Sequence, residues 1–458
     1  MQPSLLSDFE KTDKSVWKKQ ITKELKGRSY EEVLYRPAGT VAIEPYYVES
    51  ELPESTLLKD IQACQKQVPG WLTTPYVIFD APSETNKFIR RELDRGADAI
   101  WLDCQDLSVL ELDLFKTLHA IRLTDTPIFF ASSESPVALL TELTRGASYY
   151  LKGGIIHDPI ADWMKTGNTF SERMDTIAES MALTKAMREF NSYKVESHVF
   201  HDAGADIVQE LAFTLASFVT YMDQLTERGI APLLVANRFV FSISVGTDYL
   251  TEIAKLRALR YLYRRITRTY SLPDDLCHAF IHGSSSMLYQ SVRSPHTNIL
   301  RYTSEAMSGV VGGCDALTVF PFDHSFAKTS EFSERVARNT SLILKNESYM
   351  DQVADPAAGS YYLEIMTQQL AEASWNLFLD VENRGGLPAA FEQNFIQEEI
   401  KKSWNKTVSD YHNGKVLVGV NKYQVDELTL PQTPPVPVDQ VPNWEYALLK
   451  RKSLDATL

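Results

Sequence analysis

Short apolar runs alternate with longer amphipathic segments through the middle of the chain, from about residue 75 to residue 323. Between the runs, segments such as 206–226, 248–270 and 298–311 carry apolar residues at i, i+3/4 and i+7, which predicts helices. Such alternation indicates parallel strands joined by crossover helices. The apolar runs predict strands at residues 76–80, 99–103, 127–131, 148–151, 193–200, 239–244, 278–282 and 317–320.

The pattern predicts an α/β fold, a (β/α)8 barrel of the TIM type over residues 75–330. About eight units over roughly 250 residues match the size of such a barrel, whereas a doubly wound open sheet needs about five or six strands. The runs show little alternation, as expected of strands covered on both faces.

Extensions flank the expected barrel on both sides. Residues 1–74 predict an N-terminal arm, with a helix capped by Ser7 or Asp8 and an extended piece at residues 41–47. Residues 331–425 predict helices that close the barrel domain. Residues 426–458 form a tail with five prolines between 431 and 442, which predicts an extended wrapping segment and leaves too few residues for another domain.

Composition narrows the class of protein. Of 458 residues, 44% are hydrophobic and 23% charged, which is typical of a globular protein rather than a disordered one. The net charge of −14 argues against binding to nucleic acid or to an anionic membrane. We find no signal peptide or membrane-spanning run, and the four cysteines form no C-x-x-C pair, so we expect a cytoplasmic protein.

Histidines near the predicted strand ends are the first candidates for chemistry. His198 and His201 flank the end of the fifth strand beside Asp202, where a metal or a proton relay is conceivable, although hydrogen-bonded structural histidines are commoner. We therefore predict no metal site. His278 and His282 bracket the seventh strand at an even step, which places them on one face, either lining a pocket or packing against helices.

Two further motifs have mainly structural interpretations. The sequence DYHNG at residues 410–414 comes close to D-x-H-x-x-G, a cobalamin-binding pattern, but Lys415 stands where glycine is needed. We expect a turn there, followed by a strand at residues 415–420. The pairs Gly153-Gly154 and Gly312-Gly313 lie outside any phosphate-binding motif and predict turns.

Several segments in matching order and spacing resemble the methylmalonyl-CoA mutase family over about residues 75–425. The segments are VGTDYLTEIAKLRA (245–258), NILR (298–301) with EAM (305–307) and GG (312–313), ARNT (337–340) with VADPAAGSYY (353–362), AGA (203–205), NKF (86–88) and VGVNKY (418–423). The resemblance implies the substrate-type barrel of an adenosylcobalamin-dependent acyl-CoA mutase.

Departures from the family pattern fall on its polar strand ends. Val199 stands where catalytic members have a histidine, and His198 is one step out of register, on the opposite face if this stretch is a strand. The family's Q-N-D triplet appears as residues 156–158, which include His157 and Asp158. Its H-T-N-S segment becomes residues 318–321, and R-Q-Y-A-G is shortened to residues 79–82.

Together these features resemble the small, noncatalytic subunit of a heterodimeric mutase. The resemblance implies a large catalytic partner subunit that binds adenosylcobalamin and interconverts (R)-methylmalonyl-CoA and succinyl-CoA. We expect no catalytic residue, no cofactor and no cobalamin-binding domain in this chain, and an arm that wraps the partner. The residues of a candidate degenerate pocket are His157, Asp158, His198, His201, His278, His282, Thr318 and Phe320.

Two alternatives remain open at this point. The barrel itself could be catalytic, with His198 or His201 as the acid and a separate small cobalamin-binding protein docked on it. The chain could also be a nonenzymatic scaffold on a mutase fold, since fold does not determine function. A channel wide enough for pantetheine along the barrel axis would favour the catalytic version.

Overall fold

The computed structural model describes residues 13–39, 41–105, 107–132, 134–145, 150–327, 329–424 and 453–457. Ser7, Asp8 and most of the predicted proline-rich tail lie outside these residues. The longer helices are α1 (Lys14–Glu24), α2 (Ser55–Ala63), α3 (Pro82–Asp94), α6 (Pro136–Arg145), α7 (Pro159–Thr166), α8 (Ser171–Leu183), α10 (Ile207–Glu227), α12 (Tyr249–Thr269), α13 (Thr297–Val311), α14 (Glu331–Asn346), α15 (Tyr361–Glu382) and α17 (Phe395–His412). The shorter helices are α4 (Val109–Leu112), α5 (Leu114–Thr117), α9 (His198–His201), α11 (Pro232–Asn237), α16 (Gly386–Glu392) and α18 (Leu454–Thr457).

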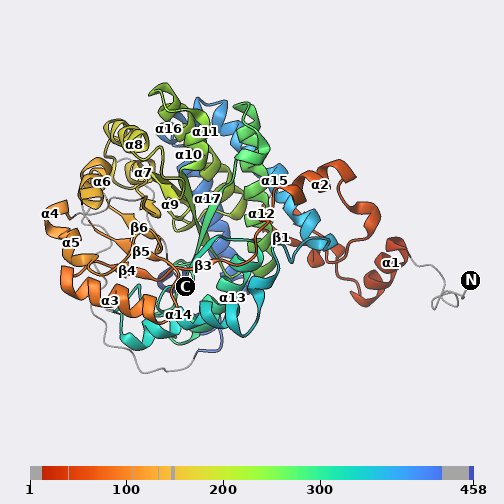
Figure 1. The fold of residues 1–458 in the computed structure, drawn as a ribbon. Coiled ribbons are helices and arrows are strands. Elements are labelled where there is room, and N and C mark those ends of the chain that lie inside the picture. The colour runs from red at the N-terminus through yellow and green to blue at the C-terminus, as the bar shows by residue number, and fades with distance from the viewer. Residues whose placement is uncertain are drawn as a thin grey trace, which may run out of the picture.

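Two five-stranded parallel sheets make up the centre of the molecule, with strand orders β4-β5-β6-β7-β8 and β3-β12-β11-β10-β9. Their helices lie on the outside, as in a barrel-like α/β fold (Figure 1). The strands are β3 (Leu72–Thr73), β4 (Tyr76–Ile78), β5 (Ile100–Asp103), β6 (Ile128–Ala131), β7 (Gly153–Ile155), β8 (Phe190–Asn191), β9 (Tyr193–Glu196), β10 (Phe239–Val245), β11 (Phe280–Ser285) and β12 (Ala316–Thr318).

The two sheets are connected at both edges by nearly continuous chain. Only residues 74 and 75 separate β3 from β4, and only Ser192 separates β8 from β9. Thr74 N–H donates to Leu317 O at 2.9 Å, while Trp101 N–H donates to Pro75 O at 3.0 Å. The segment between β3 and β4 therefore bonds to a strand of each sheet.

Buried helices cover the second sheet. Helix α10 begins at a capping box in which Asp206 accepts from the N–H groups of Val208 and Gln209, and it buries residues on all sides. Helix α15 packs against both α10 and α12, so this half of the molecule has an additional outer layer. The predicted helices at 206–226, 248–270 and 298–311 are thus confirmed within a residue or two at each end.

Several sequence-based expectations are wrong in detail. A strand forms at Gly153–Ile155, so Gly153-Gly154 belong to a strand and not to a turn. Of the strand expected at 148–151, residues 150 and 151 are not in a strand, and residues 148 and 149 lie outside the described residues. The fifth strand ends at Glu196, and residues 198–201 form helix α9 instead. No strand forms at 415–420, where the structure has only an isolated bridge between Val418 and Lys422.

The seventh strand also begins later than expected. It starts at Phe280, so His278 lies before it, is exposed, and donates its backbone N–H to the side chain of Asn237 at 3.1 Å. His282, in contrast, lies inside the strand and is buried. The expectation that these two histidines share one face of a strand is therefore wrong.

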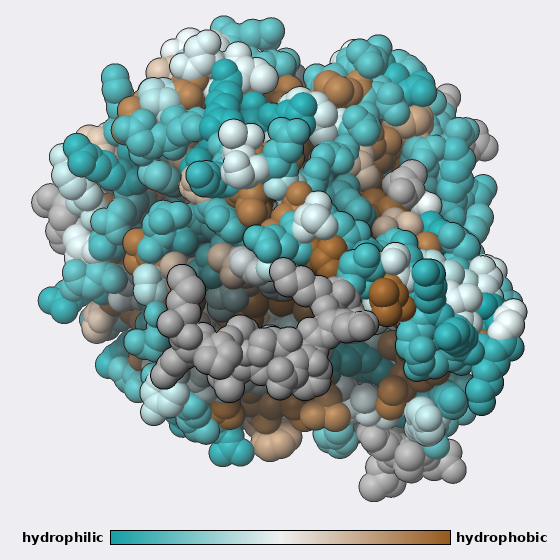
Figure 2. Space-filling model, turned by 90° about the vertical axis from the view of Figure 1, so that its right-hand side faces the viewer, coloured by the Kyte–Doolittle hydropathy of each residue, from teal (hydrophilic) through white to brown (hydrophobic). Residues whose placement is uncertain are grey.

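Within the N-terminal arm, α1 packs on the segments that follow it, while Ala38, Val41, Ile43 and Tyr47 are buried in the main hydrophobic core. The β-hairpin of β1 (Tyr35–Ala38) and β2 (Val41–Ile43) leads the chain back beside α1, whose Trp17 ring lies 5.2 Å from that of Tyr46. Lys18 forms an ion pair with Glu44 at 2.9 Å. Helix α1 buries none of its residues and projects from the rest of the molecule (Figure 1). Viewed from this side, the surface is mostly hydrophilic, with separate small hydrophobic patches (Figure 2).

A buried arginine joins α12 to the C-terminal helices. Arg257 is almost completely buried and forms ion pairs with Asp355 and with Glu364, the latter at 2.8 Å. Glu364 itself has no exposed surface. Removing one member of such a group leaves an uncompensated charge in a medium that solvates it poorly.

We expect Arg257→Met to lower the free energy of unfolding by about 3–5 kcal/mol, because Glu364 would lose its buried partner. Urea denaturation followed by circular dichroism measures this. The matched control is Arg268→Met, whose side chain is 43% exposed beside Asp60 and Asp274 and should cost at most about 1 kcal/mol. Equal losses of stability in the two variants would show that the burial of the Arg257 ion pairs does not determine the cost.

Candidate functional site

The interior between the two sheets is filled by large side chains. The Trp101 ring of β5 stacks on the His282 ring of β11 with centroids 4.0 Å apart, and Phe129 of β6 meets Phe280 of β11 at 5.8 Å. Val240 of β10 completes this interior layer. Side chains from opposite sheets therefore pack directly against each other across the axis of the fold.

His282 is held in the neutral state above this layer. Its Nδ1 lies 3.1 Å from Ser242 Oγ, and its Nε2 lies 2.8 Å from Thr318 Oγ1. Thr318 Oγ1 in turn donates to Thr74 O at 2.6 Å. Burial lowers the pKa of His282 well below its usual value. The structure thus brings together two of the predicted pocket residues, His282 and Thr318, as neighbours in a closed hydrogen-bond chain.

Phe320 extends the aromatic packing beyond the end of β12. Its ring lies 5.3 Å from Tyr76 and 4.8 Å from His324. The Tyr76 hydroxyl bonds to Asp103 at the end of β5. A strand end that binds a substrate needs free polar groups. The end of β12 instead carries the packed rings of Phe320, Tyr76 and His324.

A buried ionic cluster lies at the ends of β7 and β9. Glu196 pairs with Lys165 and with Lys194, the latter at 2.6 Å. Burial opposes ionisation of Glu196, but these two ammonium groups hold its pKa well below the usual value. Asp158 accepts from Glu196 N–H at 2.8 Å and from the Tyr221 hydroxyl at 2.7 Å. Burial and the Glu196 charge raise the pKa of Asp158 to about 6.

His157 lies at the edge of this cluster. Its Nε2 is 2.6 Å from Arg173 Nη1 and 3.1 Å from Asp162 Oδ2. The predicted pair His157 and Asp158 is therefore split between two sets of contacts, one partly exposed and one buried.

The α9 helix changes the interpretation of Val199. Because residues 198–201 are helical, adjacent side chains differ by about 100° and the strand-register argument does not apply. Val199 is buried in the main hydrophobic core. His198 Nε2 lies 2.7 Å from Ser284 Oγ, and burial lowers the pKa of His198.

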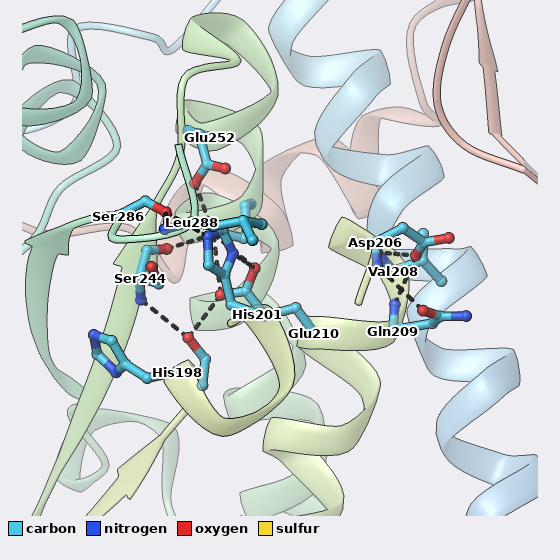
Figure 3. A network of polar contacts seen from close by, with 12 residues as sticks. His198, His201, Asp206, Val208, Gln209, Glu210, Ser244, Glu252, Ser286 and Leu288 are labelled. Carbon is cyan, nitrogen blue, oxygen red and sulfur yellow. Dashed lines mark hydrogen bonds and ion pairs between the residues drawn. The ribbon is translucent and has the colours of Figure 1, made fainter. Parts of the chain in front are cut away.

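His201 belongs to a second buried network, shown in Figure 3, in which it points toward Glu210 and Ser286 while His198 lies apart. His201 Nδ1 is 3.2 Å from Glu210 Oε2, and Nε2 is 2.7 Å from Ser286 Oγ. Lys255 joins Glu210 at 3.0 Å, Glu252 at 2.7 Å and the backbone carbonyl of Ser244 at 2.6 Å.

Ser286, His201 and Glu210 contact one another in the sequence serine, histidine, carboxylate, as in a hydrolytic triad. Their other contacts and their burial do not suit that role. Burial would lower the pKa of His201, but the Glu210 carboxylate raises it. Glu210 is also bound by the Lys255 ammonium, so this carboxylate is not reserved for the histidine. Ser286 also has no exposed surface. We conclude that the network is structural.

A cleft of about 710 Å³ borders this network on the outside. His201, Glu210 and Glu252 lie at its inner end, with Tyr289 beside them. The remaining walls come from β1 of the arm, the N-terminal ends of α10, α12 and α13, and α17. Charged side chains of both signs line it, including Arg36, Asp248, Arg301, Lys406 and Asp410.

Among the residues that the structure describes, no group of three or more His, Cys, Asp or Glu side chains could hold a metal ion. Asp410 pairs with Lys406 at 2.8 Å, one turn earlier on α17, rather than supporting His412. The D-x-H motif therefore does not fit a cobalt ligand. None of the described helices is both long and apolar enough to cross a membrane.

Sequence reasoning missed the buried ion pairs that organise both clusters. Lys194 and Glu196 alternate with Tyr193 and Val195 along β9, so a period of two was present in the sequence and indicates a polar inner face. Lys255 and Glu210 lie inside long helices, where a charged residue on the buried face cannot be told from an exposed one without the fold.

Glu210→Gln should lower the free energy of unfolding by about 3 kcal/mol at pH 7, since Lys255 and His201 lose a charged partner. Burial opposes ionisation, but Lys255 and His201 lower the pKa of Glu210 from 4.5 to about 2. Its contribution is thus complete above pH 4.5 and disappears as the pH falls toward 2. Denaturation of both chains between pH 7 and pH 3 should show the difference narrowing.

The control for this measurement is Glu142→Gln, which changes a carboxylate on α6 whose side chain is 38% exposed and pairs with Arg145. Its effect should stay within about 0.5 kcal/mol at every pH. A Glu210→Gln difference that stays constant down to pH 3 would show that the carboxylate charge is not what the network needs.

Sequence comparisons with known proteins agree on one family. A sequence model described as methylmalonyl-CoA mutase matches residues 131–453. The methylmalonyl-CoA mutase small subunit of Porphyromonas gingivalis is 30% identical over 87% of this chain and 67% of its own length. The small subunit of Streptomyces virginiae is 30% identical over 73% of this chain and 55% of its own.

A third relative, the methylmalonyl-CoA mutase of Cereibacter sphaeroides, is 28% identical over 90% of this chain and 64% of its own length. The chain thus spans between about half and two thirds of these relatives. The family model covers most of the chain, including the strands β7 to β12, α9 and the helices that carry both buried networks. The chain belongs to the methylmalonyl-CoA mutase family.

Proposed function

We propose that this chain is the small, noncatalytic subunit of a heterodimeric methylmalonyl-CoA mutase. With β3–β4 and β8–β9 each counted as one strand, the two sheets have eight strands. These close into a (β/α)8 barrel through the shared segments at residues 72–78 and 190–196. The partner is a larger subunit that binds adenosylcobalamin and interconverts methylmalonyl-CoA and succinyl-CoA. This chain stabilises that partner. The names of two relatives as small subunits support the assignment.

The observation that carries the proposal is the filled interior. A substrate held through a pantetheine arm needs a channel between the strands, and a radical reaction needs positioned donors at its end. Here Trp101, Phe129 and Phe280 occupy the axis, and the Trp101 ring lies directly on His282. Opening a channel would break this packing at a cost of about 3–5 kcal/mol for each large ring removed.

The histidines near the strand ends also favour a noncatalytic role. His198 bonds to Ser284 and has a lowered pKa, which leaves it neutral and a poor acid at pH 7. Glu210 raises the pKa of His201, and both ring nitrogens of His201 are occupied inside the protein, Nδ1 by Glu210 and Nε2 by Ser286. Neither histidine therefore combines a free position with a suitable protonation state.

The N-terminal arm is the element that we assign to partner binding. Helix α1 buries none of its own residues, yet its aromatic and ionic contacts with residues 30–51 give it a defined shape. Val16 is 48% exposed on this helix. A preformed arm loses little conformational entropy when it binds a second subunit.

We expect a tagged copy of this chain, purified gently from its native host, to bring down a larger mutase subunit in a 1:1 ratio. The visible spectrum of cobalamin should follow that subunit when the two are separated. A single small cobalamin-binding protein in its place, with turnover of an acyl-CoA by the pair, would instead make this barrel catalytic.

A variant in α1 tests whether the arm contributes to binding of the partner in the same experiment. Val16→Asp should reduce recovery of the partner about tenfold or more, because a carboxylate would have to be desolvated in the interface. The matched control is Val353→Asp, which changes a valine that is 55% exposed near the C-terminal helices. Equal recovery with both variants would exclude α1 from the interface.

In the assembled complex, His198→Ala should leave kcat within about twofold of the unmodified complex. Removing a general acid usually costs about 10²–10⁴ in rate, so a loss of that size would contradict the proposal. The exposed His278→Ala is the control for nonspecific effects. Steady-state turnover of methylmalonyl-CoA is the measurement.

A further inference from the structure

A short segment far along the chain lies against the loop that follows β11. The segment is Ser453–Thr457, which includes α18, and the loop spans residues 286–294. Leu454 has no exposed surface, and its N–H donates to Leu288 O at 3.3 Å. A surface segment of this length rarely buries a leucine completely unless it enters a shaped pocket.

The carboxylate of Asp455 is recognised by specific donors. Its Oδ1 accepts from Ser291 Oγ and its Oδ2 from Val292 N–H, both at 3.1 Å. Arg293 Nη2 donates to the backbone carbonyl of Asp455 at 2.9 Å, and Arg293 Nε lies 3.7 Å from Oδ1. The side chain is almost completely buried. A carboxylate with two donors and a nearby guanidinium is favoured strongly over a neutral amide.

The receiving loop is held in place by other parts of the fold. Asn298 of α13 accepts from Ser291 N–H and donates to Ser291 O, both at 2.9 Å. Gly419 lies so close to Ser294 that a side chain at 419 would place its Cβ 2.7 Å from the serine Cβ. The donors for Asp455 are therefore positioned by α13 and by the segment after α17, and not only by the segment that they bind.

The pocket for Leu454 reaches the inner end of the cleft. Leu454 packs with Tyr411, Leu417 and Val420, and Tyr289 packs against the same group. The Tyr289 ring also lies 6.1 Å from the His201 ring and lines the cleft. Tyr289 thus contacts both the apolar group that contains Leu454 and the ring of His201.

We propose that the loop at residues 286–294 is a binding site for a short peptide with leucine followed by aspartate, and that Ser453–Thr457 is its intramolecular ligand. The apolar pocket selects the leucine, and the Ser291 and Val292 donors select the carboxylate. Docking fixes Tyr289 beside His201 and so shapes the inner end of the cleft. This inference does not depend on the mutase assignment.

The first test measures hydrogen–deuterium exchange in the full chain carrying Asp455→Asn. The Val292 amide should exchange about tenfold faster, because it loses a charged acceptor, and fragments covering residues 287–294 should follow. Exchange in β10 should not change. The control Asp125→Asn alters an exposed carboxylate that is distant from Asp455 in the sequence. Unchanged exchange at 287–294 would overturn the proposal.

The second test adds the ligand from outside. The full chain carrying Leu454→Ala and Asp455→Asn should bind a capped synthetic peptide of residues 453–457, measured by calorimetry, whereas the unmodified chain should not, because its site is occupied. A peptide with asparagine in place of the aspartate should bind about tenfold more weakly or worse. Equal binding to both chains, or binding to neither, would overturn the proposal.

Discussion

The charge of Lys255 has no contact with water, and the surrounding structure is arranged to compensate it. An isolated ammonium in a protein interior costs several kcal/mol, so Glu210, Glu252 and the Ser244 carbonyl must all face it. These groups come from α10, α12 and β10, and Glu210 also binds His201 of α9. One buried charge therefore determines how three helices and a strand meet at the end of the second sheet.

The same constraint applies to the buried histidines. A side chain that neutralises or completes a buried network has both its orientation and its proton fixed by its partners. His201 is fixed by Glu210 and Ser286, and His282 by Ser242 and Thr318. Sequence spacing suggested a pocket lined by histidines, but the structure distributes them over separate networks.

Much of the fold could be predicted from periodicity, because strands buried on both faces and long amphipathic helices leave clear patterns. What could not be predicted depends on close approach and on local alternatives to strand. Position 153 in β7 has to be glycine, because any Cβ there would come within 2.1 Å of Ile128 O. The sequence does not reveal this close contact between the two strands. The strand at 193–196 stops early because residues 197–201 turn into α9 and bond back to Ser197. The pairs Lys255–Glu210 and Lys165–Glu196 were missed because their partners lie 45 and 31 residues apart in the sequence.

The shared segments between the two sheets also bear on how the chain reaches its native state. Strands β4 to β8 are consecutive in sequence and pair with near neighbours, so the first sheet forms from local units. The second sheet is completed only when β12, at Ala316–Thr318, pairs with β3, at Leu72–Thr73. Loop-closure entropy makes so distant a pairing slow, and the edges of β12 and β3 stay open until it forms. During synthesis, β3 must therefore remain unpaired on this edge until β12 has been made, and more than half of the chain is synthesised in between.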